Sequence, residues 1–253
     1  MTEIVLQVQG LTKVYKRSHL GRTTYSRGVN ALEFEIKKGE VFGLLGLNGS
    51  GKTTTIKLIL GLLFPTKGHV QIFGHTVPHP FAQQKIGYLP EVPYFYRNLT
   101  PVEVLTLYGT LSKVEPQNLP SKIDEVLNLV KMDHVKTKPM REFSKGMLQR
   151  IGLAQALIHD PDILILDEPV TGLDPLGIRH IRELLAQLNS KGKTILFSSH
   201  SISELERLAT RVGILIEGKL ARELDQSEWK GHAGALEEIF IETLEKSGTS
   251  LVR

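Results

Sequence analysis

Residues 46–53, Gly-Leu-Asn-Gly-Ser-Gly-Lys-Thr, have the spacing G-x-x-x-x-G-K-[ST] of a phosphate-binding loop. The loop follows the apolar run VFGLL and precedes a helix predicted to begin near Lys52, which is the context that this motif requires. Glycines let successive N–H groups turn toward an anion, and the helix N-terminus adds partial positive charge. Lys52 is predicted to reach the β- and γ-phosphates of a nucleoside triphosphate, and the Thr53 hydroxyl to ligate Mg²⁺. The residues predicted to contact the nucleotide here are Gly46, Leu47, Asn48, Gly49, Ser50, Gly51, Lys52, Thr53 and Thr54.

Two carboxylates follow a second apolar run, in the segment ILILDE at 163–168. A buried strand of this kind delivers its last residues to the edge of an α/β sheet where ligands bind. Asp167 is predicted to hold Mg²⁺ directly or through water, and Glu168 to polarise an attacking water. The alternative is a strand that ends in a solvated acidic turn, which is less favoured because the phosphate-binding loop is also present.

The elements that position these residues follow from hydrophobic periodicity. Residues 3–9 and 32–36 alternate with period two, which predicts half-exposed strands of an antiparallel edge layer. Helical patterns fill about 99–160, with helix starts predicted at Ser121 and Ser144, and strands alternate with helices after 160. Such alternation predicts a largely parallel sheet covered on both faces. The basic segment 16–28 has no apolar periodicity and is predicted to be a solvated loop, with a membrane-surface or phosphate contact as the alternative.

The composition is that of an ordinary globular protein. The 253 residues are 41% hydrophobic and carry a formal net charge of +4, without the clustered basicity that a nucleic-acid partner would need. The absence of cysteine excludes disulfides and thiolate metal sites. No apolar run reaches the roughly 18 residues of a membrane span. We therefore expect a soluble, cytosolic protein without nucleic acid, whose membrane role would need a separate partner chain.

Further motifs appear in a fixed order along the chain. They are Tyr15 in LTKVY, the signature segment 143–147 (FSKGM), the D-loop 172–174 (GLD) and His200 in SSH. Together with the phosphate-binding loop, or Walker A element, and the Walker B strand 163–167, they resemble the ATP-binding cassette (ABC) ATPases over residues 3–242. The resemblance implies an α/β fold, with a P-loop NTPase core, a mostly parallel sheet, an antiparallel β edge layer and an inserted helical subdomain.

The same resemblance implies domain boundaries. It places the ATP-binding core at 1–90 and 160–222, the helical signature subdomain at 91–159 and a short C-terminal element at 223–253. This last segment contains Trp229 and an amphipathic stretch, LEEIFIETL, and we interpret it as a small dimer-supporting or regulatory element.

The resemblance also implies an ATPase that works as a head-to-tail dimer. Glu168 is implied as the catalytic carboxylate, with Lys52 and His200 stabilising the transferred phosphoryl group. Tyr15 is implied to stack on adenine. Ser144 and Gly146 are implied to contact the ATP bound by the second cassette. Asp174 is implied to lie at the dimer contact.

Two positions depart from the family pattern. The signature reads F-S-K-G-M, so Lys145 and Met147 are unusual there, whereas Ser144 and Gly146 match. Glu91, in IGYLPE, stands where the family has its Q-loop glutamine. A carboxylate at this position can still ligate Mg²⁺, but it has no N–H group to donate to the water. The added negative charge has two possible consequences, slower hydrolysis or tighter metal binding.

The work coupled to hydrolysis is inferred from residues 91–105, EVPYFYRNLTPVEVL, where the family receives the membrane subunit. The sequence is similar to bacterial exporter cassettes of the multidrug and natural-product resistance type. This implies an integral membrane permease as partner, a second and identical cassette, and a peripheral location at the cytoplasmic face of the membrane. Packing in the core of the helical subdomain is the alternative role for the aromatic residues of this segment. A soluble ABC ATPase in translation or DNA repair is the alternative function, disfavoured by the single Walker A motif and the lack of extended heptads.

Overall fold

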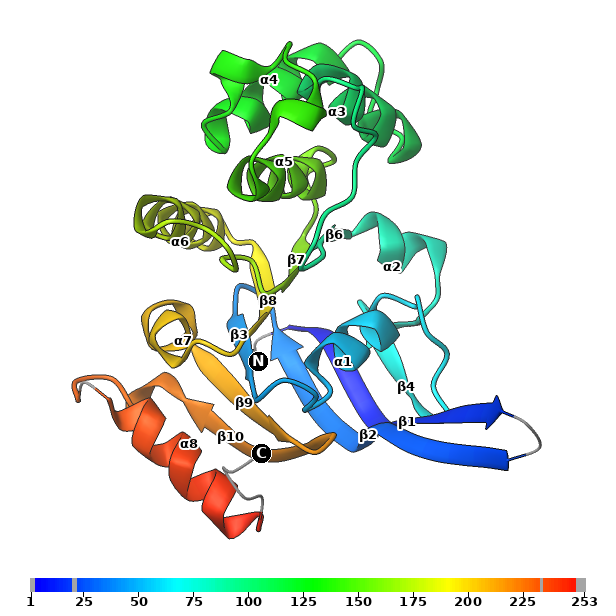
Figure 1. Cartoon of the computed structure of the whole chain (residues 1–253), viewed down its shortest axis with the longest axis vertical. Coiled ribbons are helices and arrows are strands. Elements are labelled where there is room, and N and C mark those ends of the chain that lie inside the picture. Colours follow the sequence, from blue (N-terminus) through cyan, green and yellow to red (C-terminus); the bar gives the residue numbers. More distant parts are fainter. Residues whose placement is uncertain (1–2, 20–21, 233, 249–253) are drawn as a thin grey trace. The chain divides into compact units, whose positions relative to one another are not determined.

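The computed structural model describes residues 3–19, 22–232 and 234–248. The chain forms two compact units, one of Met1–Gln83 with Leu196–Arg253 and one of Gln84–Ile195. Both combine strands with helices (Figure 1), and they contain an antiparallel sheet and parallel strand pairs, so the predicted α/β fold class is confirmed. The division into the domains 1–90 with 160–222, 91–159 and 223–253 stays a prediction.

An antiparallel sheet in the first unit confirms the predicted edge layer. Its strand order is β2-β1-β4-β5. The strands are β1 (Ile4–His19), β2 (Arg22–Lys37), β4 (Lys67–Ile72) and β5 (His75–Thr76). In β2, Leu32, Phe34 and Ile36 are buried while Glu33 is exposed, as period-two alternation requires. The Phe34 ring stacks on Phe42 at a centroid distance of 5.3 Å, which joins this sheet to the core of the unit.

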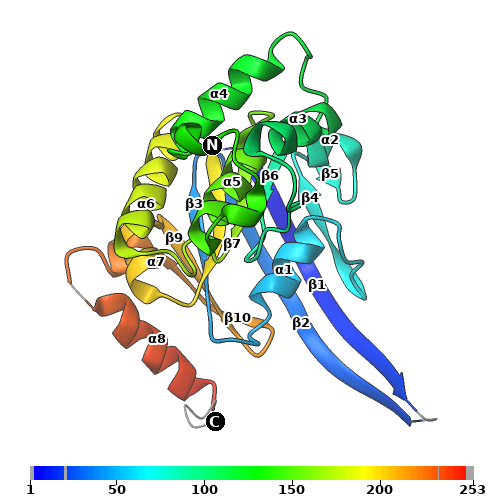
Figure 2. The ribbon, with the colours of Figure 1, turned by 45° about the horizontal axis from the view of Figure 1, so that its top comes forward.

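The prediction of a solvated loop over 16–28 is wrong. Strands β1 and β2 continue through this segment, with Lys16 opposite Tyr25, while β4 accompanies β1 only as far as Thr12. Residues 13–19 and 22–29 thus form a two-stranded ribbon (Figures 1 and 2), which we call the basic ribbon; residues 20 and 21 lie outside the described chain. Lys16 and Tyr25 are both exposed. Backbone pairing alone can hold two strands together, and the mainly polar residues 16–28 have no apolar periodicity that would signal it.

The strands that carry the phosphate-binding loop lie in the same unit. Strand β3 (Val41–Leu45) is buried throughout and runs parallel to β9 (Arg211–Ile216), which pairs with the antiparallel β10 (Lys219–Asp225). A wholly apolar run is what a parallel strand covered on both faces requires. The other elements are α1 (Lys52–Ile59), α2 (Pro80–Gln84), α7 (Ile202–Leu208) and β8 (Thr194–Ser199); α2 and β8 extend across the limits of the unit.

The C-terminal segment is attached to α7. It contains η3 (Gln226–Glu228) and α8 (Ala235–Lys246), and α8 confirms the predicted amphipathic segment as a helix. The Trp229 indole is buried and donates to the Glu206 carbonyl at 3.4 Å. The Leu236 N–H donates to the Glu206 carboxylate at 3.3 Å. Strand β10 was not predicted, because its polar sequence, KLARELD, shows no buried face before β9 is placed beside it.

The second unit contains the predicted helical block. Strand β6 (Ile86–Leu89) runs parallel to β7 (Ile163–Asp167). The helices are α3 (Pro101–Leu111), α4 (Leu119–Leu129), η1 (Asp133–Val135), η2 (Met140–Glu142), α5 (Lys145–Leu157) and α6 (Pro175–Ser190). Helix α4 begins two residues before the predicted start, because Pro120 fits its first turn and the Ser121 hydroxyl donates to the Asn118 carbonyl at 2.8 Å instead of capping. Within the described ranges, no helix has both the length and the apolar character to cross a membrane.

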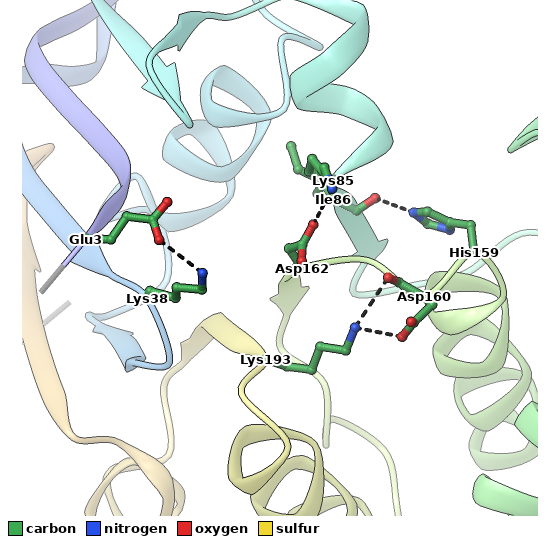
Figure 3. A network of polar contacts seen from close by, with 8 residues as sticks. All are labelled: Glu3, Lys38, Lys85, Ile86, His159, Asp160, Asp162 and Lys193. Atoms are coloured by element: carbon green, nitrogen blue, oxygen red, sulfur yellow. Dashed lines mark hydrogen bonds and ion pairs between the residues drawn. The ribbon is translucent and has the colours of Figure 1, made fainter.

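A polar network fixes the chain where it enters β7 (Figure 3). Lys193 pairs with Asp160 at 2.6 Å, and Lys85 pairs with Asp162 at 2.8 Å. His159 contacts the Ile86 carbonyl through Nε2 at 3.0 Å, and burial lowers the pKa of its imidazole. These contacts join the entry of β7 to the entry of β6, so the network sets the position of the strand that ends in Asp167.

Candidate functional site

The phosphate-binding loop connects β3 to α1 in the first unit. Its backbone turns through left-handed conformations at Gly49, with φ 84°, and Gly51, with φ 107°. A Cβ at position 51 would lie 2.7 Å from the carbonyl oxygen of Gly28, so strand β2 leaves room only for glycine. Both glycines are therefore required by the backbone path that the motif predicted.

Lys52 is held inside this loop. Its side chain is buried, and Nζ donates to the Gly46 carbonyl at 2.8 Å and to the Leu47 carbonyl at 3.3 Å. The Ser50 hydroxyl is also buried and has no hydrogen-bond partner among the described residues. Phosphate oxygens can replace these two carbonyls as partners of the Lys52 ammonium. The buried Ser50 hydroxyl and the N-terminus of α1 lie beside it, so the loop suits an anionic ligand.

Tyr15 lies beside the first turn of α1. Its hydroxyl is 3.3 Å from the Thr54 hydroxyl, and its ring covers Gly28. A Cβ at position 28 would lie 2.6 Å from Cε2 of Tyr15. The structure therefore brings Tyr15, the predicted adenine-stacking residue, and Thr54 together next to the phosphate-binding loop.

Gly28→Ala is expected to weaken ATP binding several-fold while leaving the fold intact. The added methyl group displaces the Tyr15 ring, which loses its stacking position, and aromatic stacking of a base contributes about 1–3 kcal/mol. Titration with a fluorescent ATP analogue measures the affinity, and thermal unfolding measures stability. Gly39→Ala changes a glycine with no neighbour within 4 Å and a φ of 74°, so it should lower thermal stability through backbone strain but leave ATP affinity unchanged. Equal affinities of Gly28→Ala and the wild type would contradict the role of Tyr15.

His200 lies in the same unit as the phosphate-binding loop. It follows the last residue of β8 and is exposed, and Ser201 separates it from α7. This is the strand-end position that the sequence predicted. Its contact with a γ-phosphate stays a prediction.

The two predicted carboxylates occupy the end of β7 in the second unit. Asp167 is 2% exposed and Glu168 is 7% exposed. Glu168 has a φ of 49°, and its carboxylate accepts from the Thr171 hydroxyl at 3.4 Å. A non-glycine residue in this left-handed region is uncommon and often marks a functional site. The alternative of a solvated acidic turn does not fit two buried carboxylates.

Tyr88 of β6 lies near Asp167. Burial, with a contribution from the Asp167 charge, raises the pKa of the neighbouring Tyr88 hydroxyl to about 12. Glu91 leaves the sheet at the same edge, since Leu89 of β6 pairs with Leu166 of β7. Two carboxylates at one sheet edge are ligands that Mg²⁺ accepts, together with phosphate oxygens of a substrate. The described residues contain no cluster of three or more His, Cys, Asp or Glu side chains that could hold a metal ion.

The signature segment begins α5. The Ser144 hydroxyl caps this helix by accepting from the Met147 N–H at 3.3 Å. Gly146 faces the D-loop, where a Cβ at position 146 would lie 3.1 Å from Cδ2 of Leu173. Asp174 caps α6 by accepting from the Gly177 N–H at 2.7 Å. The second unit therefore brings the predicted residues Ser144, Gly146 and Asp174 together.

Signature and D-loop line one pocket of about 550 Å³. Its other walls include Lys131, His134 and Arg150. Pockets of this size accommodate ligands as large as a nucleotide. The sequence predicted the signature and the D-loop separately, and the pocket that joins them appears only in the structure.

Gln149 received no functional role from the sequence, which assigned it to surface or packing. Packing is correct, because Gln149 is fully buried and its Nε2 donates to the Pro169 carbonyl at 3.3 Å. Its Oε1 has no partner among the described residues. Gln149 thereby connects α5 to the segment that directly follows Glu168. In the sequence, only the position of Gln149 on the apolar face of the helix predicted from Ser144 indicates that it is buried.

Comparisons with known proteins identify the family. The profile described as ABC transporter matches residues 29–171. An ABC transporter ATP-binding protein from Nostoc sp. is 42% identical over 87% of this chain and 66% of its own length. The bacitracin transport ATP-binding protein BcrA of Bacillus licheniformis is 42% identical over 87% of this chain and 69% of its own length. The lantibiotic transport ATP-binding protein SrtF of Streptococcus pyogenes is 39% identical over 93% and 96%. The chain belongs to the ABC transporter family, as one of its ATP-binding subunits.

Solved structures agree with this assignment. The ATP-binding subunit of an ABC transporter superposes with a TM-score of 0.81 and 28% identity, over 94% of this chain and 99% of that one. The ATP-binding cassette MJ0796, solved as a dimer bound to ADP and Pi in a post-hydrolysis state, gives a TM-score of 0.80 at 25% identity, over 87% and 98%. The fold is that of an ABC ATPase cassette. The chain spans about two thirds of the length of the Nostoc and Bacillus relatives.

Proposed function

We propose that this chain hydrolyses ATP and thereby powers a membrane exporter. The observation that carries the proposal is the pair Asp167 and Glu168, two buried carboxylates at the end of β7 in a chain that also has an intact phosphate-binding loop. A nucleotide-binding switch without turnover would lack Lys52 or Glu168. Both are present.

In the proposed reaction, water attacks the γ-phosphate of ATP in line with the bond to the β-phosphate, and ADP leaves. Glu168 orients or deprotonates this water. Lys52 and the N–H groups of the phosphate-binding loop neutralise the triphosphate, and Tyr15 stacks on adenine. His200 stabilises charge on the transferred phosphoryl group.

Mg²⁺ is proposed as the cofactor. The side chains that would hold it are Thr53, Asp167 and Glu91, and their hydroxyl and carboxylate oxygens fit a hard cation. When bound, the ion neutralises charge on the β- and γ-phosphates. At Glu91 a carboxylate replaces the amide of the family, so this position contributes negative charge and no hydrogen-bond donor.

The proposed working unit is a head-to-tail dimer of two copies of this chain. Ser144 and Gly146 contact the ATP held by the partner, and Asp174 lies at the dimer contact. The dimeric structure of the related cassette MJ0796 supports this arrangement. ATP binding closes the dimer, hydrolysis opens it, and this motion drives the transporter.

The proposed partner is an integral membrane permease, and the cassette is peripheral at the cytoplasmic face of the membrane. Tyr94 and Tyr96 support a docking site after β6, since they are 86% and 71% exposed. Core packing accounts for Phe95, whose ring meets Tyr108 edge-on at 6.2 Å, but not for these two tyrosines. Bacitracin transport and lantibiotic transport, the functions named for two relatives, support the exporter.

A pull-down from detergent-solubilised membranes of the source cells tests the partner, with the cassette tagged and ATP present. We expect an integral membrane protein to be recovered with the wild type and lost with Tyr94→Ala/Tyr96→Ala, because docking buries both rings. Tyr25→Ala is the matched control, since Tyr25 is 67% exposed but lies on the basic ribbon. Recovery of ribosomes or DNA-repair proteins without a membrane protein would replace the exporter by the soluble ABC ATPase.

A further inference from the structure

Lys145 is one of the two unusual residues of the signature segment, and its side chain lies across the D-loop. A Cβ at position 172 would lie 2.8 Å from Cδ, Cε and Nζ of Lys145. Gly172 has a φ of 78° and no side chain, so it leaves the space that the lysine stem fills. Lys145 therefore connects the two segments that line the pocket of about 550 Å³.

The Lys145 ammonium is available to a ligand. The residue is exposed, and within the described ranges its Nζ makes no ion pair or hydrogen bond with another protein group. Lys52 and Lys193, by contrast, are bonded to oxygen atoms of the protein. A lysine that lines a pocket without an internal partner is suited to an anion that enters from outside.

The pocket as a whole is positively charged. Lys131, Lys145 and Arg150 line it, and Asp174 is the one carboxylate among the described residues that line it. The Asp174 carboxylate already accepts from the Gly177 N–H. Burial is the main cause that lowers the pKa of His180, and the charges of Lys131 and Arg150 act in the same direction. The partial positive charge at the N-terminus of α5 adds to these positive charges.

We propose that Lys145 is a nucleotide-binding residue of the signature, whose ammonium contacts phosphate oxygens of the ATP held by the second copy of this chain. This inference rests on the proposed head-to-tail dimer. Ser144 and Gly146 supply a hydroxyl and close backbone approach, and Lys145 adds a full positive charge. A primary ammonium is a compact charge suited to phosphate.

The test measures ATP-driven dimerisation by sedimentation in the Glu168→Gln background, where we expect closed dimers to accumulate. Lys145→Met removes the charge and keeps much of the stem, and Lys145→Arg keeps the charge. We expect Lys145→Met to weaken dimerisation about 100-fold at saturating ATP, because a dimer of two copies loses one charge-assisted hydrogen bond, about tenfold in affinity, at each of its two sites. Its salt dependence should also become shallower, because fewer charges are screened. Lys145→Arg should stay within about twofold of the parent.

Two further measurements separate binding from folding. ATP affinity of the isolated monomer should be unchanged by Lys145→Met, because the monomer binds ATP through its own phosphate-binding loop. Lys138→Met is the matched control, an exposed lysine of the same unit outside the pocket, and it should dimerise like the parent.

The role of Lys145 would be overturned if Lys145→Met dimerised as strongly as the parent. It would also be overturned if Lys145→Arg weakened dimerisation as much as Lys145→Met does. A parent that binds ATP but never dimerises would overturn both this role and the dimer on which it rests. A parent that binds no ATP would overturn the proposed function itself. The monomer titration tells these last two results apart.

Discussion

Glu168→Gln is expected to lower the rate of ATP hydrolysis by about 100-fold or more, the contribution of a positioned general base. The amide keeps the size of the side chain and its contact to Thr171 but takes up no proton from water. ATP binding should be retained, because the phosphate-binding loop is untouched, and a closed dimer should accumulate. Phosphate release at saturating MgATP measures the rate, and sedimentation with ATP measures the dimer.

The control for this substitution is Glu125→Gln, at an exposed glutamate of α4. It removes the same charge from the same unit and should hydrolyse ATP at the wild-type rate. Thermal unfolding should show that both variants are folded, since Gln adopts the backbone of Glu168 with the same strain. Equal hydrolysis rates for Glu168→Gln and the wild type would remove Glu168 from the mechanism.

Lys52→Ala is expected to lower the affinity for ATP by about 100-fold or more. The ammonium forms charge-assisted hydrogen bonds with phosphate oxygens, each of which contributes about 1.5–3 kcal/mol. In the free protein it bonds to the carbonyls of Gly46 and Leu47, so the variant also loses two contacts within the loop. Isothermal titration calorimetry with MgATP measures the affinity, and circular dichroism checks the fold.

Lys57→Ala is the matched control, because Lys57 is an exposed lysine in the last turn of the same helix. Its loss should leave the affinity within about twofold, as is usual for surface substitutions. A Lys52→Ala variant that binds ATP as tightly as Lys57→Ala would show that the loop does not hold the triphosphate.

The sequence was most informative where a structural feature depends on residues that are close together in the chain. Spacing alone located the phosphate-binding loop, because the path through Gly49 and Gly51 is available only to glycine. The run ILILDE similarly located Asp167 and Glu168 at the end of a buried strand. Ser144 was recognised as a helix start because capping needs only the next few N–H groups.

Features that depend on a distant partner escaped the sequence. The basic ribbon was predicted to be a loop, because its two strands pair through their backbones and residues 16–28 have no apolar periodicity. Strand β10 escaped for a related reason, since β9 supplies its partner. Helix α4 began earlier than predicted, because Pro120 competes with Ser121 for the helix start.

The sequence by itself therefore determined the chemistry of this protein, namely the loop, the carboxylates and the order of the family motifs. The tertiary structure decided how the supporting residues are used. It placed Tyr15 over Gly28, fixed Gln149 to the segment after Glu168, and laid Lys145 across Gly172. The physical reason is range. A turn or a cap is encoded within a few residues, whereas a pocket is formed by side chains that only packing brings together.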